Sequence, residues 1–212
     1  MSTELCLGHL IRAVEEHNVS TRGMALHYLT LHSILLGMEA QSTLEFGAGA
    51  STSIFLAAHQ VTGGRHFSIS TEPRDAVDGG RCARMSVGDR WFHFQGLSSE
   101  ILPNLLLRRL GVVLHDGSHS TPVVESDLRA VLPFVAQYGL ILVHDTQHSY
   151  VGPSMRQAIE NIVGEFDVSH VTLPYGFGLT IIRNESSLQP PMTFTWKKHG
   201  SDHRTASCRI GP

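Results

Sequence analysis

Residues 43–52 read Thr-Leu-Glu-Phe-Gly-Ala-Gly-Ala-Ser-Thr, and this stretch decides the fold of the 212-residue chain. Its apolar start predicts the end of a buried strand. Gly47 and Gly49 predict a sharp turn that a ligand can approach closely. Ser51 or Thr52 can then cap a helix that continues through an apolar run. A strand, a glycine turn and a helix N-terminus together indicate the nucleotide crevice of a doubly wound α/β fold.

Two positions in this stretch bear on the kind of nucleotide. A dinucleotide fingerprint has glycine where this chain has Thr52, and it has no use for the acid Glu45. That acid can instead reach a cationic or hydrogen-bonding part of a ligand. The pattern resembles motif I of class I S-adenosylmethionine-dependent methyltransferases, acid-x-Gly-x-Gly-x-Gly, with Ser51 in place of the last glycine. In that family the acid helps to hold the methionine ammonium group.

Composition limits the class of protein and its partners. The length suits one domain with a sizeable core, and 42% hydrophobic with 17% charged residues is ordinary for a globular protein. A net charge of −3 argues against a nucleic-acid partner, which requires a basic footprint. The three widely spaced cysteines indicate neither a disulfide framework nor a zinc site. No signal peptide or membrane-spanning run is predicted, so we expect a cytoplasmic protein without a membrane partner.

The segments that precede and follow the predicted sheet in the sequence carry no motif of a particular chemistry. Amphipathic helices are expected at residues 3–17 and 22–39, where they would cover the site or form a dimer contact. Their histidines, His27 among them, are interpreted as surface or packing residues. The tail from Asn184 is expected to be disordered or to form an arm on a neighbouring subunit. This reading gives one methyltransferase domain over residues 1–183, with N-terminal helices at 1–40 and a tail at 184–212.

Polar residues follow the second and third predicted strands. Glu72 comes after the strand at 66–70, where a carboxylate can accept both ribose hydroxyl protons; the alternative is a surface acid before a turn. Leu97 and Ser98 follow the strand at 91–95. In methyltransferases this loop flanks the adenine, often through an acid. Leu97 would offer an apolar contact instead.

Two later strands each end in histidine and aspartate. Residues 111–114 precede His115-Asp116, and residues 140–143 precede His144-Asp145. Thr121-Pro122 is expected to open the helix between them, with Thr121 as its cap. Another helix is expected at about 154–163, and strands at 168–172 and 178–183 are expected to form an antiparallel edge hairpin. Because adjacent parallel strands lie about 5 Å apart, Asp116 and Asp145 should face one crevice, where they must share a proton, recruit cations or bind a metal.

Four segments sharpen the resemblance. They are Asp-Gly-Ser-His at 116–119, the Thr-Pro helix start, Gly-Leu-Ile-Leu-Val-His-Asp-Thr at 139–146 and Leu-Pro-Tyr-Gly-Phe-Gly-Leu at 173–179. Over about residues 22–183 the chain resembles small bacterial methyltransferases of natural-product tailoring, including antibiotic pathways. These include the metal-dependent sugar O-methyltransferases of macrolide pathways and the cephamycin-pathway enzymes.

The resemblance implies roles for the strand-end residues. Asp116 and Asp145 would bind magnesium and His119 would act as the base. His144 stands where the metal-dependent members have an acid, which weakens the case for magnesium or favours manganese, iron or zinc. In the alternative interpretation His144 and His115 are packed residues that hydrogen-bond to the backbone.

The expected fold is α/β and Rossmann-like: a seven-stranded, mostly parallel sheet with an antiparallel edge hairpin and N-terminal cap helices. The expected enzyme is a homodimer that methylates a hydroxyl of a small molecule. The expected catalytic residues are His119 and Asp116, and the expected metal ligands are Asp116, His144 and Asp145. The expected contacts of S-adenosylmethionine are Glu45, Gly47, Ala48, Gly49, Ser51, Thr52, Glu72, Leu97, Ser98 and Asp116.

Alternatives remain at this stage. One is a metal-independent N- or carboxyl methyltransferase in which Asp116 and His119 only orient the acceptor. Another is an inactive adenosylmethionine-binding subunit or scaffold. A nicotinamide-dependent oxidoreductase is disfavoured by Thr52 and Glu45.

Overall fold

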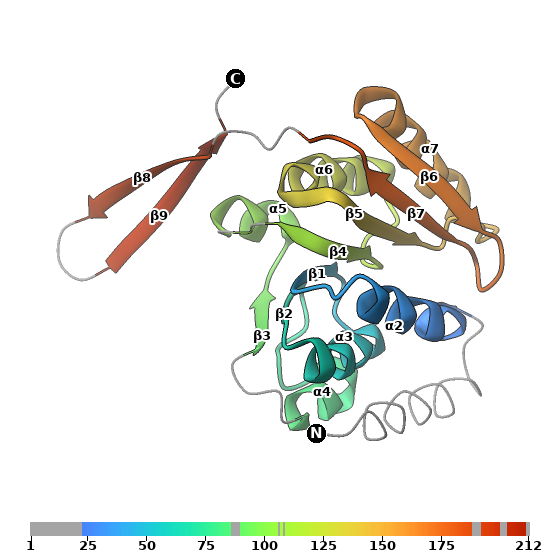
Figure 1. Ribbon diagram of the computed structural model, residues 1–212, viewed down its shortest axis with the longest axis horizontal. Coiled ribbons are helices and arrows are strands. Elements are labelled where there is room, and N and C mark those ends of the chain that lie inside the picture. The colour runs from blue at the N-terminus through green and yellow to red at the C-terminus, as the bar shows by residue number, and fades with distance from the viewer. Residues whose placement is uncertain are drawn as a thin grey trace.

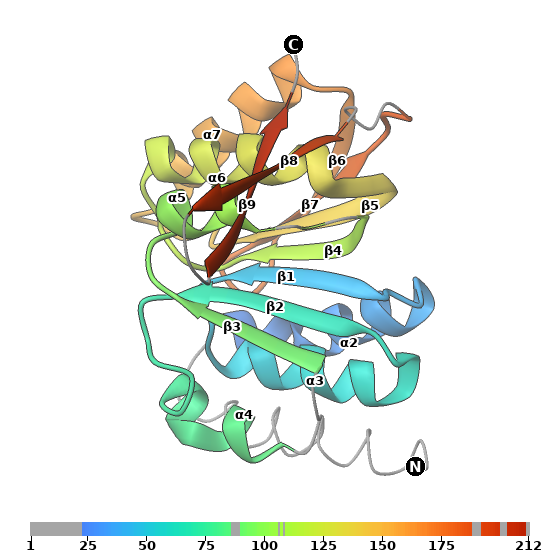
Figure 2. The same ribbon diagram turned by 90° about the vertical axis from the view of Figure 1, so that its left-hand side faces the viewer.

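The computed structural model describes residues 23–85, 90–105, 107, 109–187, 192–199 and 203–210. Its centre is a seven-stranded sheet with the order β3-β2-β1-β4-β5-β7-β6 (Figures 1 and 2). β1 to β5 are mutually parallel, whereas β7 runs antiparallel to both β5 and β6. The strands are β1 Ser42–Phe46, β2 Arg65–Ser70, β3 Trp91–Gln95, β4 Leu110–His115, β5 Val135–His144, β6 Val168–Leu173 and β7 Leu179–Asn184.

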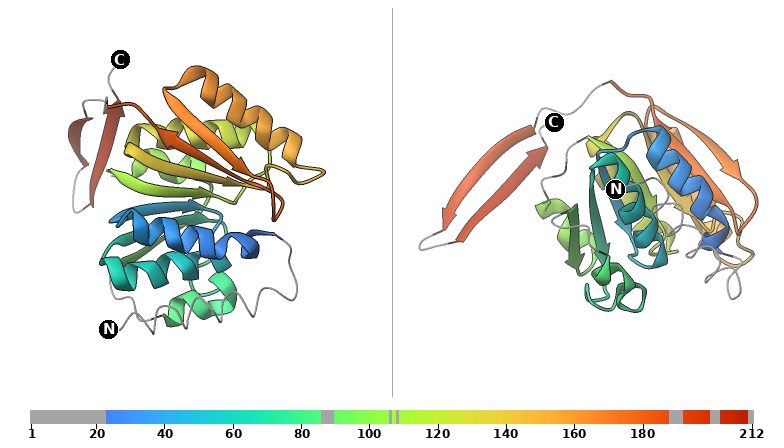
Figure 3. Two further views of the ribbon diagram at one scale, coloured as in Figure 1. Left: turned by 45° about the vertical axis from the view of Figure 1, so that its right-hand side comes forward. Right: turned by 60° about the horizontal axis from the view of Figure 1, so that its bottom comes forward.

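Helices cover both faces of the sheet. Figure 2 shows α2 and α3 on one face and α6 and α7 on the other, and Figure 3 (left) shows α2 beside α3. The longer helices are α2 Tyr28–Gly37, α3 Ala50–Thr62, α6 Thr121–Val131 and α7 Gly152–Glu165. The short ones are η1 Met24–His27, η2 Val77–Gly80, α4 Arg81–Arg84, α5 Ser98–Ile101, η4 Leu102–Asn104 and η5 Leu132–Phe134.

β4 shows how the apolar strands build two cores. Because successive side chains of a strand point to opposite faces, Val113 packs with α6 and α7 while Val112 and Leu114 pack with α2 and α3. All three are fully buried. A continuous apolar run of this kind requires helices on both sides, so the doubly wound architecture follows from the sequence of the central strands.

The predicted sheet is confirmed, including the pairing of Leu114 with Leu142 and the antiparallel β6–β7 hairpin at the edge. Three local predictions are wrong. In place of one α-helix at 22–39, the short 3-10 helix η1 is followed directly by α2, which ends at Gly37. β5 runs straight through the predicted boundary at Gly139. The predicted helix at 3–17 lies outside the described residues.

The third wrong prediction concerns the residues that cap α3 and α6. α3 begins at Ala50 with Gly49 as its N-cap, and the Thr52 hydroxyl accepts a hydrogen bond from the Gly49 N–H at 3.1 Å. α6 begins at Thr121 with Ser120 as its N-cap. Ser51 and Thr52 fail as caps because their hydroxyls lie inside the first turn and donate to Glu45.

The described part of the tail is a β-hairpin rather than disordered chain. β8 Met192–His199 pairs antiparallel with β9 His203–Ile210 as a separate sheet. In Figure 1 this hairpin stands away from the seven-stranded sheet. Its role as an arm on a second subunit stays a prediction. Among the described residues, no helix combines the length and apolarity that crossing a bilayer requires.

Candidate functional site

The glycine turn after β1 touches the loop after β4. Gly47 has φ +87°, and a Cβ there would lie 2.4 Å from the Asp116 carbonyl oxygen and 2.7 Å from the Gly117 Cα. The Asp116 N–H donates to the Phe46 carbonyl at 3.0 Å, and the Gly47 N–H donates to the Ile69 carbonyl at 2.9 Å. Only glycine fits this approach, which ties the ends of β1, β2 and β4 together.

A cavity of about 480 Å³ opens at these strand ends, a size typical of small-molecule sites. It extends over the carboxyl ends of β1, β2, β3 and β4, where ligands bind in open α/β sheets. Six of the predicted cofactor contacts line it: Gly47, Ala48, Glu72, Leu97, Ser98 and Asp116. Four do not line it: Glu45, Gly49, Ser51 and Thr52.

Glu45 lies beneath the turn instead of in the cavity. Its fully buried carboxylate accepts hydrogen bonds from Ser51 (3.0 Å) and Thr52 and pairs with His66 Nε2 at 3.0 Å. Strand alternation explains the direction, because Phe46 packs toward α6 and Glu45 must then point toward α3. In this structure the acid therefore braces the glycine turn at the positive end of α3.

Asp116, His144 and Asp145 form a compact cluster at the ends of β4 and β5. One potential ligand atom from each lies within 4.8 Å of the others. His144 Nδ1 is 3.0 Å from Asp116 Oδ1 and 3.3 Å from Asp145 Oδ1. Its Nε2–H donates to the Gly176 carbonyl at 3.0 Å, which holds the ring with Nδ1 toward the acids. The expected proximity of Asp116 and Asp145 is confirmed.

His144 offsets part of the negative charge in this cluster. Burial lowers the pKa of this imidazole, but its hydrogen bonds to Asp116 and Asp145 outweigh burial and raise the pKa to about 10. Burial raises the pKa of Asp145, yet His144 and His119 bring it below its usual range. At neutral pH an imidazolium therefore separates the two carboxylates. A divalent cation fits the same place, because it would replace the Nδ1 proton between two oxygens and one nitrogen.

His119 stands at the outer side of the cluster. Its Nε2 is 2.7 Å from Asp145 Oδ2, and its side chain is 39% exposed. If the Nε2–H donates to that carboxylate, Nδ1 keeps a lone pair for a proton from an acceptor. His115 has a different environment, as expected for a residue in the sheet packing: it is fully buried and pairs with Asp127.

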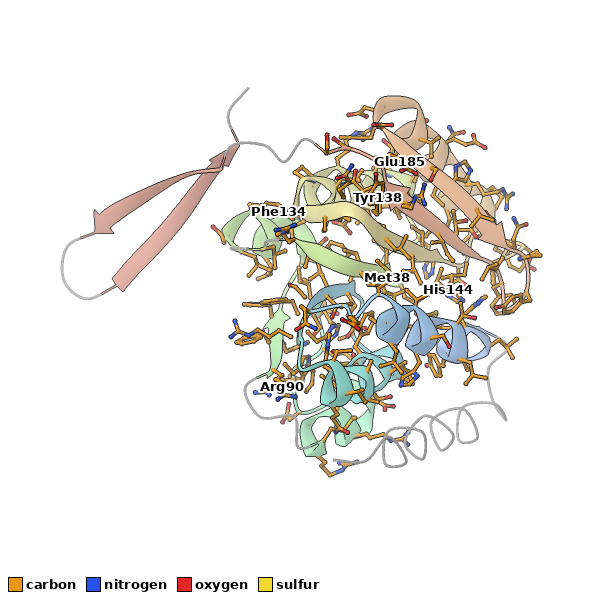
Figure 4. The ribbon with its side chains drawn as sticks, in the orientation of Figure 1. Met38, Arg90, Phe134, Tyr138, His144 and Glu185 are labelled. Atoms are coloured by element: carbon orange, nitrogen blue, oxygen red, sulfur yellow. The ribbon has the colours of Figure 1, made fainter. Side chains whose placement is uncertain are left out.

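Sequence reasoning missed the supports of His144. His27 is fully buried, and its Nε2 approaches the same Gly176 carbonyl at 3.2 Å. The His27 ring stacks on Tyr175 and lies 5.6 Å from the His144 ring, edge to face. Figure 4 marks His144 where β5 ends near α2. Only the fold brings His27 and the β6–β7 turn together, so no local signal could reveal them.

Residues 44–146 match the family model of a methyltransferase domain. This segment of the chain is similar to a methyltransferase domain. The match runs from β1 through the end of β5, so it includes Glu45, Asp116, His119 and Asp145. The seven-stranded, mostly parallel sheet with helices on both faces is the Rossmann-like fold of solved methyltransferases.

Several solved methyltransferases have the same fold as this chain. The SAH-bound methyltransferase PaMTH1 of Podospora anserina has a TM-score of 0.70 at 14% identity, with 84% of this chain and 88% of that chain covered. The O-methyltransferase TomG of Streptomyces achromogenes, involved in tomaymycin synthesis and solved with SAM, has a TM-score of 0.65 at 20% identity, covering 84% and 90%. A Bacillus cereus O-methyltransferase with SAH has 0.63 at 14%, covering 87% and 92%.

No curated protein sequence matches the chain. At the identities of the three solved structures, the likeness extends to the fold.

Proposed function

We propose that the domain transfers a methyl group from S-adenosylmethionine (SAM) to a hydroxyl of a small molecule, with a divalent cation beside the acceptor. One observation carries this proposal: Asp116 belongs both to the cavity at the strand ends and to the cluster with His144 and Asp145. A cofactor in the cavity would thus end where an acceptor can be deprotonated. The SAM or SAH bound to PaMTH1 and TomG supports the choice of cofactor.

Different residues of the cavity would contact different parts of a bound SAM. The exposed Glu72 carboxylate can accept from the ribose hydroxyls. Gly47 lets the methionine part approach the main chain. SAM supplies an electrophilic methyl group on its sulfonium. Because transfer is an in-line displacement, the protein's main task is to position the acceptor oxygen and remove its proton.

His119 and the three residues of the cluster would prepare the acceptor together. Asp145 Oδ2 orients His119, whose Nδ1 would take the hydroxyl proton. Asp145 Oδ1, Asp116 and His144 Nδ1 would hold the cation. A bound cation would lower the pKa of a neighbouring hydroxyl, as it does for water. The mixed oxygen and nitrogen set suits manganese at least as well as magnesium.

Side chains around the cluster suit an acceptor with an apolar part. Tyr150 is 87% exposed, Tyr175 46% and Phe177 39%. Phe177 lies edge to face on His148, with ring centroids 4.7 Å apart. Together with the resemblance to tailoring enzymes, this rim favours a hydroxylated natural-product intermediate. We further propose a cytoplasmic homodimer that binds neither nucleic acid nor membrane.

A metal-independent reaction is the second candidate, and one observation favours it. The protonated His144 already pairs with both Asp116 and Asp145 and offsets one of their two negative charges without a cation. In that case the carboxylates would hold an acceptor amine or orient the acceptor. Dialysis against chelator separates the two, because activity that survives it in full excludes the metal-assisted reaction.

Calorimetry tests cofactor choice. We expect S-adenosylhomocysteine (SAH) to bind and NAD to give no heat. Glu72→Ala should weaken SAH binding by about 1–3 kcal/mol, since it leaves the ribose hydroxyls unpaired. Glu160→Ala, which removes an exposed carboxylate on α7, is the matched control and should leave the affinity unchanged. Micromolar binding of NAD without binding of SAH contradicts the proposal.

A further inference from the structure

A carboxylate of α6 lines the cavity in addition to Glu72 and Asp116. Val123 and Asp127 lie four residues apart on α6, and both line the cavity. Asp127 is only 4% exposed. The lining also includes the buried Ile69 and the exposed Leu97. A buried carboxylate and three apolar side chains therefore line the same cavity.

His115 fixes this carboxylate. The His115 Nε2 lies 3.1 Å from Asp127 Oδ2, and because a carboxylate only accepts, the proton is on Nε2. His115 Nδ1 is buried without a partner, and a proton there would be an unpaired buried donor. Among the residues that the structure describes, His115 is the one hydrogen-bond partner of the Asp127 carboxylate. The second oxygen, Oδ1, is thus left as an acceptor for a ligand in the cavity.

The direction of the cofactor decides what meets this oxygen. The methyl group must lie near Asp116, where the cavity joins the cluster, so the purine base extends away from β5 toward Leu97, which follows the edge strand β3. Val123 and Asp127 of α6 line the same cavity. Adenine carries one strong exocyclic donor, its 6-amino group. The loop after β3 offers no acid for that amine, because Leu97 stands there.

We propose that Asp127, held by His115, is the specificity residue that accepts a hydrogen bond from the 6-amino group of the cofactor's adenine. This inference rests on the proposed function, since it assumes that SAM occupies the cavity. Asp127 is then a binding residue and His115 a positioning residue. If the His115–Asp127 pair served only folding, its replacement would change the binding affinity of all purine cofactors by the same factor.

Cofactor analogues test this on the unaltered protein. By calorimetry, SAH should bind roughly 10- to 100-fold more tightly than S-inosylhomocysteine, whose 6-oxo group is an acceptor and meets another acceptor at Asp127. The analogue without a 6-substituent should also bind more weakly than SAH. If the protein binds SAH and both analogues with equal affinity, the inference is overturned without any variant.

Asp127→Asn gives the sharper test. His115 Nε2–H will keep the asparagine oxygen, so the amide NH₂ replaces Oδ1 as the group that faces the cavity. The preference for SAH over S-inosylhomocysteine should fall by at least about 10-fold, because the 6-oxo group now meets a donor. Glu125→Gln, the same change on α6 where the side chain contacts Arg129 and Asn161, should keep the original ratio.

The outcomes separate this inference from the proposed function. If the unaltered protein binds neither SAH nor its analogues, the proposed function fails. If it binds and prefers SAH, and Asp127→Asn keeps that ratio, only the role of Asp127 is overturned. If Asp127→Asn binds both SAH and S-inosylhomocysteine more weakly but with the same ratio, the His115–Asp127 pair likewise serves folding alone.

Discussion

Replacing Asp145 with asparagine is expected to remove metal-dependent methyl transfer while SAH affinity stays nearly unchanged. The substitution takes one negative charge from the cluster and weakens the bond that orients His119. Turnover should fall more than about 100-fold, because both the cation and the base lose their support. The backbone should tolerate the change, since Asp145 has φ +60° and asparagine also adopts the left-handed region.

Activity assays with added manganese, together with calorimetry for SAH, measure this effect. Asp75→Asn, which makes the same change at an exposed position, is the control and should behave as the parent protein. Near-normal turnover of Asp145→Asn, or full activity of the parent after exhaustive chelation, would show that the carboxylates serve another purpose.

His119→Ala is expected to lower turnover by roughly 10²- to 10⁴-fold, the range typical of a lost general base, with SAH binding intact. The ring is exposed beside the cluster, so its removal should leave the core packing undisturbed. His148→Ala is the comparison, because His148 lies in the loop after Asp145 and packs on Phe177. A loss under about fivefold for His119→Ala, with His148→Ala far worse, would move the base to that later loop.

The backbone around the cavity was predictable because its signals are local. Gly47 and Gly49 indicated the turn. The alternation of apolar and polar residues predicted the bounds of β3, Trp91–Gln95. The meeting of Asp116 with Asp145 was also predictable, because both follow buried parallel strands that pair in register. In each case a few neighbouring residues and the rules of sheet geometry were sufficient.

Side-chain direction was harder to predict. Motif resemblance placed Glu45 at the ligand, but the pleat of β1 turns it under α3, where Ser51, Thr52 and His66 bind its carboxylate. Counting the strand alternation from Phe46 would have indicated this. The local pattern also misplaced the helix caps by one to three residues, because several adjacent hydroxyls compete for that position.

Other features depend on contacts between distant segments. The orientation of His144 depends on the Gly176 carbonyl, which is contributed by the β6–β7 turn. The partnership of His115 with Asp127 needs β4 and α6 in place. No spacing in the chain encodes these contacts, and the described hairpin β8–β9 was likewise not anticipated.

The most direct test of the account is a crystal structure of the protein grown with SAH and manganese, with the metal located by its anomalous signal. The account predicts SAH in the cavity between Gly47 and Glu72 and one anomalous peak bounded by Asp116, His144 and Asp145. SAH bound elsewhere, or SAH in the cavity with His144 still paired to both carboxylates and no peak between them, would contradict metal-assisted methyl transfer at this site.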